Sequence, residues 1–495
     1  MDKIKRTSDV IVDLNMYLAN QCSASEILNK TCEYFDEIKN EKLSTADKHF
    51  LYFLANQVGV PQYFDMLKKF DQDTTVPIAN LGDFCTSVGE SKLFTSENVC
   101  LHRYQKAVLN KFSRKGLNRF FLSASTSFGK TFLVYEIIRK MEYKNILLIF
   151  PTIALLSENL EKIQSDTNYL WIKNGYKIHT LSNAKLESNN DDKHIFIYTP
   201  ERYLSFLDFG VNIKFDFAFI DEVYKIDNEY LVDEELKENE RDVAYRLALF
   251  YIFRNSFIDA LLAGPYIQFS DRNRSNYNPS FDNFLSDYKI EPINYNQYEI
   301  VKKDYFDATS KQSLNIDNYP ITLQNNGKQK KFEDIILAIV GHNENTIVYC
   351  SRKSDTERYA NLLLNYGCLP AIDTSSFANF VEHINKVYEN SQDWIVAKAL
   401  TKGIGIHNGL VPKYIQKEII SLFNKGYLKI LLSTTTITEG VNTTAKNIIV
   451  LSHKKGEKEL KTFDALNISG RAGRFLTHYK GNVISLDNKF IEIKD

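Results

Sequence analysis

The sequence has few of the features that mark zinc-binding, secreted or membrane-spanning proteins. Its 495 residues include only six cysteines, and no two of them form a C-x-x-C pair. This scatter argues against a zinc site and favours reduced, mostly buried thiols, so we expect a cytoplasmic protein. No apolar run approaches the roughly 18 residues of a membrane-spanning helix, and no apolar signal segment follows the basic start of the chain. We therefore expect a soluble protein with no membrane partner.

An excess of charge of either sign is also missing. Sixty-one basic and 62 acidic residues leave a formal net charge of −1, so no overall positive field indicates a nucleic-acid partner. Any site for nucleic acid must be local. The composition, 44% hydrophobic and 25% charged, is that of an ordinary globular protein, and the length allows about three domains.

Residues 1–95 show helical periodicity without strand signals. Ser23 with Glu26, and Ser44 with Asp47, begin apolar helical patterns in the manner of capping boxes, although the second box has Asp where Glu or Gln is preferred. We expect a small helical domain over 1–95.

Short apolar runs alternate with helical patterns in the rest of the chain, which is typical of strands buried in parallel sheets. The expected strands of a first series are 120–122, 146–150, 195–198, 217–220 and 261–263, and those of a second series are 347–350, 395–397, 430–432, 448–451 and 483–486. A polar stretch, 270–330, separates them. The pattern predicts two tandem α/β domains, over 96–290 and 291–495.

The segment from Ala124 to Thr131 reads Ala-Ser-Thr-Ser-Phe-Gly-Lys-Thr, a phosphate-binding loop with Ala124 in place of the usual first glycine. It lies between a predicted strand and a predicted helix over 131–141, which is the context that this motif requires. Backbone amides there can wrap the phosphates of a nucleotide, the Lys130 amine can contact the β- and γ-phosphates, and the Thr131 hydroxyl can ligate Mg²⁺. The expected nucleotide-binding residues of the loop are Ser127, Phe128, Gly129, Lys130 and Thr131.

Two further elements complete an ATPase pattern. The predicted strand 217–220 ends in Asp221 and Glu222; Asp221 can hold the water shell of Mg²⁺, and Glu222 can orient or deprotonate an attacking water. The alternative is a solvated acidic strand end. Far along the chain, Gly-Arg-Ala-Gly-Arg places Arg471 and Arg474 where they could reach the same phosphates from a second domain. The sequence therefore suggests a split ATPase site.

Motifs occur in a characteristic order between about residues 98 and 490. They are Leu101-His102-Arg103-Tyr104-Gln105, the phosphate loop, Phe150-Pro151-Thr152, Thr199-Pro200-Glu201-Arg202, Asp221-Glu222-Val223-Tyr224, Gly405–Leu410, Ile430–Asn442 and Asn467–Arg474. In this order the chain resembles superfamily 2 DEAD/DEAH-type helicases, and among them the superkiller-type (Ski-like) branch.

The resemblance implies an α/β fold of two tandem RecA-like parallel-sheet domains preceded by a small helical domain, with ATP and Mg²⁺ bound in the cleft between the sheets. It adds Gln105, which would read the adenine edge, and Gly440 to the nucleotide-binding residues. Arg471 and Arg474 would approach from the second domain. A single strand would cross both domains on its phosphates. The residues implied to hold it are Pro151, Thr152, Thr199, Arg202, Ser351, Arg352, Thr434 and Thr435.

Three motifs depart from the family pattern. Ala263-Gly264-Pro265-Tyr266 replaces Ser-Ala-Thr, Asn467 replaces Gln, and Tyr224 replaces His. Family drift is the simpler explanation. The alternative is a subfamily that couples ATP hydrolysis to strand binding in its own way, through Tyr266. Asp221–Ile226 together with Gly264-Pro265-Tyr266 resemble helicases of bacterial anti-phage systems of the Hachiman type.

These features favour an ATP-dependent translocase or helicase on single-stranded or tailed nucleic acid, with DNA slightly favoured over RNA. The alternative is an ATP-switched clamp that regulates a partner nuclease without processive unwinding. An ATPase that ignores nucleic acid is disfavoured, because three of the motifs would have no role in it. The Ski-like branch has ring-closing domains after the second RecA-like domain, and the sequence ends at Asp495. We expect low processivity unless a partner or additional helicase domains supply the ring.

Overall fold

The computed structural model describes residues 3–183, 192–210, 213–226, 240–254, 257–267, 279–317, 319–324, 327–365, 369, 373–388, 393–437, 443 and 445–494. The chain forms two compact units. The first is Met1–Ile300 with Phe475–Tyr479, and the second is Val301–Arg474 with Lys480–Asp495. The division at residues 95 and 290 that the sequence suggests remains a prediction.

The first unit begins with helices. They are α1 (Lys3–Leu18), α2 (Ala24–Ile38), α3 (Thr45–Gln57), α4 (Gln62–Asp65) and α5 (Leu81–Ser91). Both predicted capping boxes are confirmed: the hydroxyls of Ser23 and Ser44 accept from the amides of Glu26 and Asp47, whose carboxylates accept from the serine amides in return. Each box satisfies amides that would otherwise lack partners at a helix start.

A seven-stranded parallel sheet follows, in the order β3-β4-β2-β5-β6-β1-β7. Its strands are β1 (Arg119–Ala124), β2 (Asn145–Ile149), β3 (Lys177–His179), β4 (His194–Tyr198), β5 (Phe217–Ile220), β6 (Asp259–Gly264) and β7 (Glu291–Tyr295). All five strands expected in the first series are confirmed. Strand β7 comes from the polar stretch, where the sequence predicts no strand, because its residues are mostly exposed at a sheet edge and lack an apolar run.

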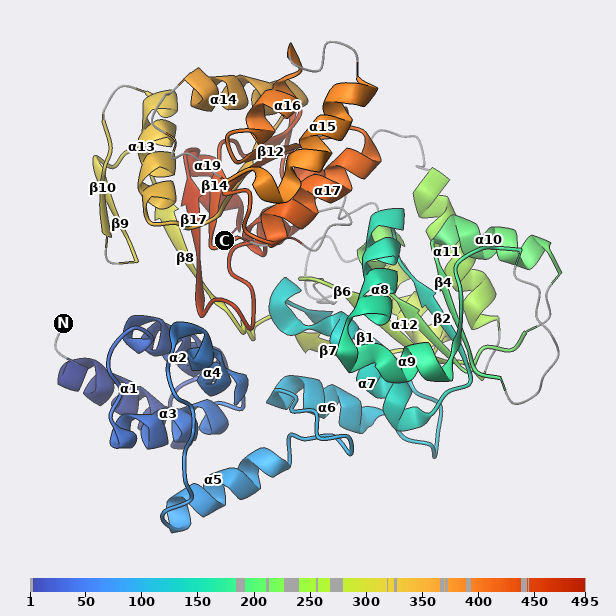
Figure 1. Ribbon diagram of the computed structural model, residues 1–495. Coiled ribbons are helices and arrows are strands. Elements are labelled where there is room, and N and C mark those ends of the chain that lie inside the picture. The colour runs from blue at the N-terminus through green and yellow to red at the C-terminus, as the bar shows by residue number, and fades with distance from the viewer. Residues whose placement is uncertain are drawn as a thin grey trace. The chain divides into compact units, whose positions relative to one another are not determined.

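Alternate residues of these strands face opposite sides of the sheet. One side joins the N-terminal helices in a single core with α7 (Lys130–Met141), α8 (Ile153–Ser165) and α9 (Leu170–Gly175), which lie together over the sheet in Figure 1. On the other side Phe121 packs edge-to-face on Phe281 of α12 (Pro279–Asp287), and Phe196 packs on Phe206 of α10 (Pro200–Asp208). The first sheet is therefore covered on both faces, as a parallel sheet requires.

The second unit holds a six-stranded parallel sheet in the order β12-β13-β11-β14-β17-β8. Its strands are β8 (Lys302–Asp307), β11 (Thr346–Tyr349), β12 (Ile404–His407), β13 (Ile430–Ser433), β14 (Asn447–Val450) and β17 (Lys480–Ser485). Two parallel sheets behind N-terminal helices confirm the predicted fold class.

One expected strand of the second series is wrong. Residues 395–397 begin helix α16 (Ile395–Leu400), which buries Val396, Ala397, Ala399 and Leu400. A short apolar run does not by itself distinguish a buried helix from a buried strand. The sequence also missed β12, whose apolar residues are interrupted by Gly405.

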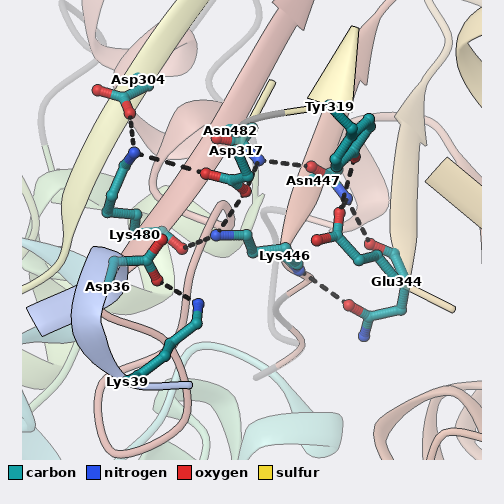
Figure 2. A network of polar contacts seen from close by, with 11 residues as sticks. Asp36, Lys39, Asp304, Asp317, Tyr319, Glu344, Lys446, Asn447, Lys480 and Asn482 are labelled. Atoms are coloured by element: carbon teal, nitrogen blue, oxygen red, sulfur yellow. Dashed lines mark hydrogen bonds and ion pairs between the residues drawn. The ribbon is translucent and has the colours of Figure 1, made fainter. Parts of the chain in front are cut away.

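A buried polar network joins β14 and β17 to the turn of a small hairpin, β9 (Ser313–Ile316) and β10 (Tyr319–Thr322), in the second unit (Figure 2). Asp317, between the hairpin strands, accepts from Lys446 Nζ at 2.8 Å and from Asn482 Nδ2 at 2.8 Å, while Lys480 Nζ lies 2.9 Å from Asp304. Burial opposes ionisation of Asp317, but the lysine charges and the amide outweigh it and lower its pKa to about 2. Paired charges thus fix the edge strand β8 and the hairpin to the sheet.

Candidate nucleotide and nucleic-acid site

The phosphate loop connects β1 to α7. A short 3-10 turn, Thr126–Phe128, leads to Gly129, which has a φ of +79°. This φ favours glycine, and a Cβ at this position would lie 2.7 Å from Gln105 Nε2, so the glutamine side chain would have to shift. Within the described part of the chain, no side chain forms a capping hydrogen bond at the N-terminus of α7. The amides of its first turn are therefore available to phosphate oxygens, which fits the predicted binding of a nucleotide by Ser127, Phe128, Gly129, Lys130 and Thr131.

Lys130 folds back on this loop. Its Nζ donates to the carbonyl oxygens of Ala124 at 3.0 Å and Ser125 at 2.9 Å. The Ser125 side chain is fully buried, and its hydroxyl has no hydrogen-bond partner within the described part of the chain. The Lys130 ammonium and the unpaired, buried Ser125 hydroxyl are both groups that can donate hydrogen bonds to a phosphate ligand.

Asp221 and Glu222 follow β5 at the same carboxyl edge of the sheet. The Asp221 carboxylate is buried and accepts from the Glu222 amide at 3.0 Å, and the Tyr245 hydroxyl donates to the Asp221 carbonyl. Burial and the neighbouring charge of Glu222 raise the pKa of Asp221, while Lys130 opposes the rise. Glu222 has a φ of +53°, a strained conformation for a residue with a Cβ. The two carboxylates therefore share one site with the phosphate-loop lysine.

His102 and Gln105 brace the phosphate loop from the start of α6 (Arg103–Lys111). The His102 Nδ1 accepts from the Gln105 amide at 3.2 Å, so its Nε2 donates to the Phe128 carbonyl, 3.1 Å away. Gln105 Nε2 donates to the same carbonyl at 3.0 Å. Burial lowers the pKa of His102 to about 4, which keeps the imidazole neutral. The role of Gln105 at an adenine edge stays a prediction, and sequence reasoning missed His102, whose only signal is its place just before a helix.

Tyr266 links the phosphate loop to the end of the first unit. It follows β6, has a φ of +51° and is buried. Its hydroxyl donates to Glu299 Oε1 at 3.0 Å. Burial and the charge of Glu299 raise the pKa of Tyr266 well above its usual value, against the opposing effect of hydrogen bonds with Thr126 of the phosphate loop. Tyr266 thus contacts both Glu299 and the phosphate loop through a phenol hydroxyl, a group that the family's Ser-Ala-Thr motif does not contain.

The expected strand-binding residues of the first unit lie at two helix starts on the same edge of the sheet. Thr152, after β2, caps α8 and accepts from the Leu155 amide at 3.3 Å; Thr199, after β4, caps α10 and accepts from the Arg202 amide at 3.3 Å. Because β2 and β4 are neighbours, the two helices begin at adjacent strand ends, although α8 and α10 cover opposite faces of the sheet. Pro151 precedes the first cap, and the Arg202 guanidinium donates to the Thr180 carbonyl at 2.7 Å.

The corresponding residues of the second unit also follow adjacent strands, β11 and β13. Ser351 Oγ donates to Asp355 at 3.1 Å, and the half-exposed Arg352 pairs with Glu457 at 3.2 Å. Thr434 follows β13, and its hydroxyl lies 3.3 Å from that of Thr436. Thr435 begins a short 3-10 turn beyond it. Gly440, expected to bind nucleotide, lies outside the described residues.

Arg471 and Arg474 sit on a braced loop after α18 (Thr462–Ser469). The Ala445 amide donates to the Arg471 carbonyl at 3.0 Å, and the Gly473 amide donates back to the Ala445 carbonyl at 2.7 Å. A Cβ at Gly481 would collide with the backbone of Ala472 and Gly473, so the loop is also closely packed. That the two arginines reach a nucleotide remains a prediction.

Fold and loop together define a P-loop protein built on two RecA-like sheets. Family models match as "DEAD/DEAH box helicase" over residues 102–244 and as "Helicase conserved C-terminal domain" over residues 373–476. The chain therefore carries both conserved domains of the DEAD/DEAH box helicases of superfamily 2, a class of ATP-hydrolysing enzymes, which confirms the predicted family and enzyme class. Such a helicase binds ATP and nucleic acid. No helix among the described residues has both the length and the apolar character to cross a membrane.

The chain is also similar to individual proteins with helicase or anti-phage names. The chain is 28% identical over 368 residues to "Anti-bacteriophage protein B" of Escherichia coli, a match that covers 74% of this chain and 45% of the relative. It is 31% identical over 149 residues to "Antiviral helicase SKI2" of Saccharomyces cerevisiae, covering 28% and 11%, and 30% identical over 99 residues to "Hachiman protein HamB" of Bacillus cereus, covering 20% and 9%. The chain thus spans less than half the length of these curated relatives.

Proposed function

We propose that the chain is a motor that holds a single nucleic-acid strand and moves along it while hydrolysing ATP between its two RecA-like domains. One observation carries this proposal. The phosphate loop after β1, the carboxylates after β5 and the helix starts after β2 and β4 all lie at the carboxyl edge of one sheet. Groups suited to ATP and groups suited to a strand therefore lie along one edge of the same sheet, which supports a role in which ATP hydrolysis acts on a bound strand.

In this proposal each residue has a defined task. Lys130 leaves the carbonyls of Ala124 and Ser125 and contacts the β- and γ-phosphates. Thr131 and Asp221 would hold Mg²⁺, which would supply positive charge beside the phosphate oxygens. Glu222 orients or deprotonates the attacking water, and Arg471 and Arg474 add positive charge when the domains close.

The strand is held by its phosphates. Amides at the starts of α8 and α10 and the nearby hydroxyl and guanidinium groups suit phosphate oxygens, and such contacts carry little base information. We therefore propose that single-stranded or tailed nucleic acid of any sequence is a substrate, with DNA slightly favoured over RNA. The name "Anti-bacteriophage protein B" of the E. coli relative supports a role in anti-phage defence.

A second candidate is an ATP-switched clamp that regulates a partner nuclease. It is favoured by the replacement of the Ser-Ala-Thr motif with Ala263-Gly264-Pro265-Tyr266, which removes the hydroxyls that would couple hydrolysis to movement. Displacement of streptavidin from a biotinylated strand separates the candidates. A motor removes the block during hydrolysis, whereas a clamp only changes its dwell time on the strand.

The direct test is the ATPase rate of the purified chain with and without single-stranded DNA and RNA, with Lys130→Ala as the inactive control. A motor shows strong stimulation by at least one polymer. An ATPase rate that neither polymer changes would contradict the proposal, and the larger stimulation names the preferred polymer.

A further inference from the structure

The N-terminal helices hold both short segments through which the chain passes between its two units. The chain leaves the first unit after Ile300, returns for Phe475–Tyr479 and leaves again. We call 297–300 the first crossover segment and 475–479 the second crossover segment. Both are described parts of the first unit, and the second directly follows Arg474.

Helices α2 and α4 bind the first crossover segment through its backbone. The Tyr63 hydroxyl donates to the Ile300 carbonyl at 2.6 Å, and the Ser25 hydroxyl donates to the Gln297 carbonyl at 2.7 Å. The Cys32 thiol lies 3.5 Å from the same Ile300 oxygen. Ile300 itself is fully buried.

Helices α2 and α4 and the 3-10 helix Met66–Phe70 bind the second crossover segment, mainly through its aromatic residues. The Tyr479 ring is fully buried and stacks on Phe35 with centroids 5.3 Å apart and on Phe70 at 6.2 Å. Its hydroxyl donates to the Tyr63 carbonyl at 2.7 Å. Lys69 Nζ donates to the Leu476 carbonyl at 2.5 Å. Tyr63 therefore forms a hydrogen bond with each crossover segment, with the first through its hydroxyl and with the second through its carbonyl.

Phe475 connects this cluster to the phosphate loop. Its ring packs edge-to-face on Tyr63, with centroids 6.4 Å apart, and on His102 at 6.0 Å. His102 in turn packs edge-to-face on Phe128 of the phosphate loop at 4.9 Å and bonds its carbonyl. A continuous set of contacts thus runs from the phosphate loop to the residue beside Arg474.

The backbone between the two aromatic anchors is strained. Leu476 has a φ of +66°, which is rare for a residue with a branched side chain, and that side chain is half exposed. Such a conformation persists where its surroundings impose it. Phe475 and Tyr479 on either side, and the Lys69 bond to its carbonyl, are the contacts that impose it here.

We propose that Tyr63 and Tyr479 are positioning residues that present the arginine element, Arg471 and Arg474, in one orientation to the nucleotide. The N-terminal helices then act as a clamp on the two crossover segments. Through His102, the contacts of Phe475 depend on the conformation of the phosphate loop. This inference rests on the proposed function, in which Arg474 acts on bound ATP. The N-terminal helices, which lie outside both helicase family matches, would then have a positioning role in ATP hydrolysis.

Two conservative variants test the clamp in the full chain. Tyr479→Phe and Tyr63→Phe each remove one hydroxyl and keep the ring, so the core stays filled. We expect kcat for ATP hydrolysis to fall about two- to tenfold, the effect of one hydrogen bond, with little change in the affinity for fluorescent ADP. Tyr34→Phe is the matched control, because its hydroxyl lies 2.8 Å from Thr7 within the same helices and contacts neither crossover segment.

A second readout does not depend on turnover. Amide hydrogen exchange of the peptide over 473–481 should accelerate in both variants and stay unchanged in Tyr34→Phe. Parental kcat and parental exchange in Tyr479→Phe and Tyr63→Phe would overturn the clamp. A loss of kcat equal to that of Tyr34→Phe would show general destabilisation instead and would also overturn it.

A double variant separates this inference from the proposed function. In an Arg474→Ala background, Tyr479→Phe should cause no further loss, because the tyrosine acts through the arginine. Multiplicative losses would refute positioning through Arg474 and leave the role of Arg474 intact. Parental turnover of Arg474→Ala alone would instead remove the proposed role of the arginine, whatever the tyrosine variants do.

Discussion

The hydroxyl of Tyr266 donates a hydrogen bond to Glu299 Oε1 over 3.0 Å. Glu299 belongs to the first crossover segment, and Tyr266 also contacts Thr126 of the phosphate loop. In a family whose third motif is usually Ser-Ala-Thr, this pair supplies a different link between the nucleotide site and the chain that leads to the second unit. This pair supports the prediction that Tyr266 couples ATP hydrolysis to strand binding.

We therefore predict that Tyr266→Phe lowers strand-stimulated kcat about two- to tenfold, because the variant loses its hydrogen bonds while keeping the buried ring. Glu299→Gln keeps an acceptor and should lose less. Tyr198→Phe is the control, since its hydroxyl donates at 2.9 Å to the Leu181 carbonyl, away from the phosphate loop. Steady-state ATPase assays with saturating single-stranded DNA measure all three. A Tyr266→Phe rate equal to that of Tyr198→Phe would contradict the link.

Lys130→Ala and Glu222→Gln should separate binding from chemistry. The first variant removes the cation that would contact the β- and γ-phosphates, so we expect ATP hydrolysis to be abolished. The second leaves the site's shape but removes the base or orienting carboxylate, so ATP should bind while turnover stalls. Fluorescent nucleotide titration and single-turnover hydrolysis give the two quantities. Near-parental turnover of either variant would show that its role is assigned wrongly.

Binding of single strands should weaken steeply with salt, by about 0.7 in log affinity per log salt for each phosphate contact. Arg202→Ala should reduce this slope by about 0.7 if its guanidinium contacts a phosphate. Arg114 is the matched control because it precedes β1, at the opposite edge of the sheet, where it pairs with Glu142. Fluorescence anisotropy over a range of salt concentrations measures the slope. Equal slopes for parent and Arg202→Ala would exclude this contact.

His102 should make the protein less stable in mild acid. Its pKa is about 4 in the folded chain because of burial, against an ordinary value of about 6.5 when unfolded. Between these values the unfolded chain binds the proton and the folded chain does not, so stability falls as pH decreases, by up to about 1.4 kcal/mol per pH unit.

His102→Asn keeps an acceptor for the Gln105 amide and removes this titration. We expect its melting temperature to fall less than that of the parent between pH 7 and pH 5, when each is compared with its own value at pH 7. Differential scanning fluorimetry measures both. Parallel losses in parent and variant would show that His102 does not titrate in this way.

Local chemistry explains which features could be predicted from the sequence. A strand, a glycine with a positive φ and a helix start lie within 25 residues of one another around Gly129, and each leaves its own residue pattern. The capping boxes at Ser23 and Ser44 are equally local, since the bonds join residues three apart. The short apolar run at 395–397 shows the limit, because its residues suit a buried strand and a buried helix equally well.

By itself the sequence determined the phosphate loop, most strands of the two series and the family, because hydrogen bonds between near neighbours and the period of burial impose regular spacing on residues. Only the tertiary structure decided that Tyr63 meets Ile300, 237 residues away, and Tyr479, 416 residues away. It also decided that His102 braces Phe128 and that Tyr266 meets Glu299. Such contacts depend on which surfaces the folded chain brings together, and a single aromatic or hydroxyl side chain carries no periodic signal of its distant partner.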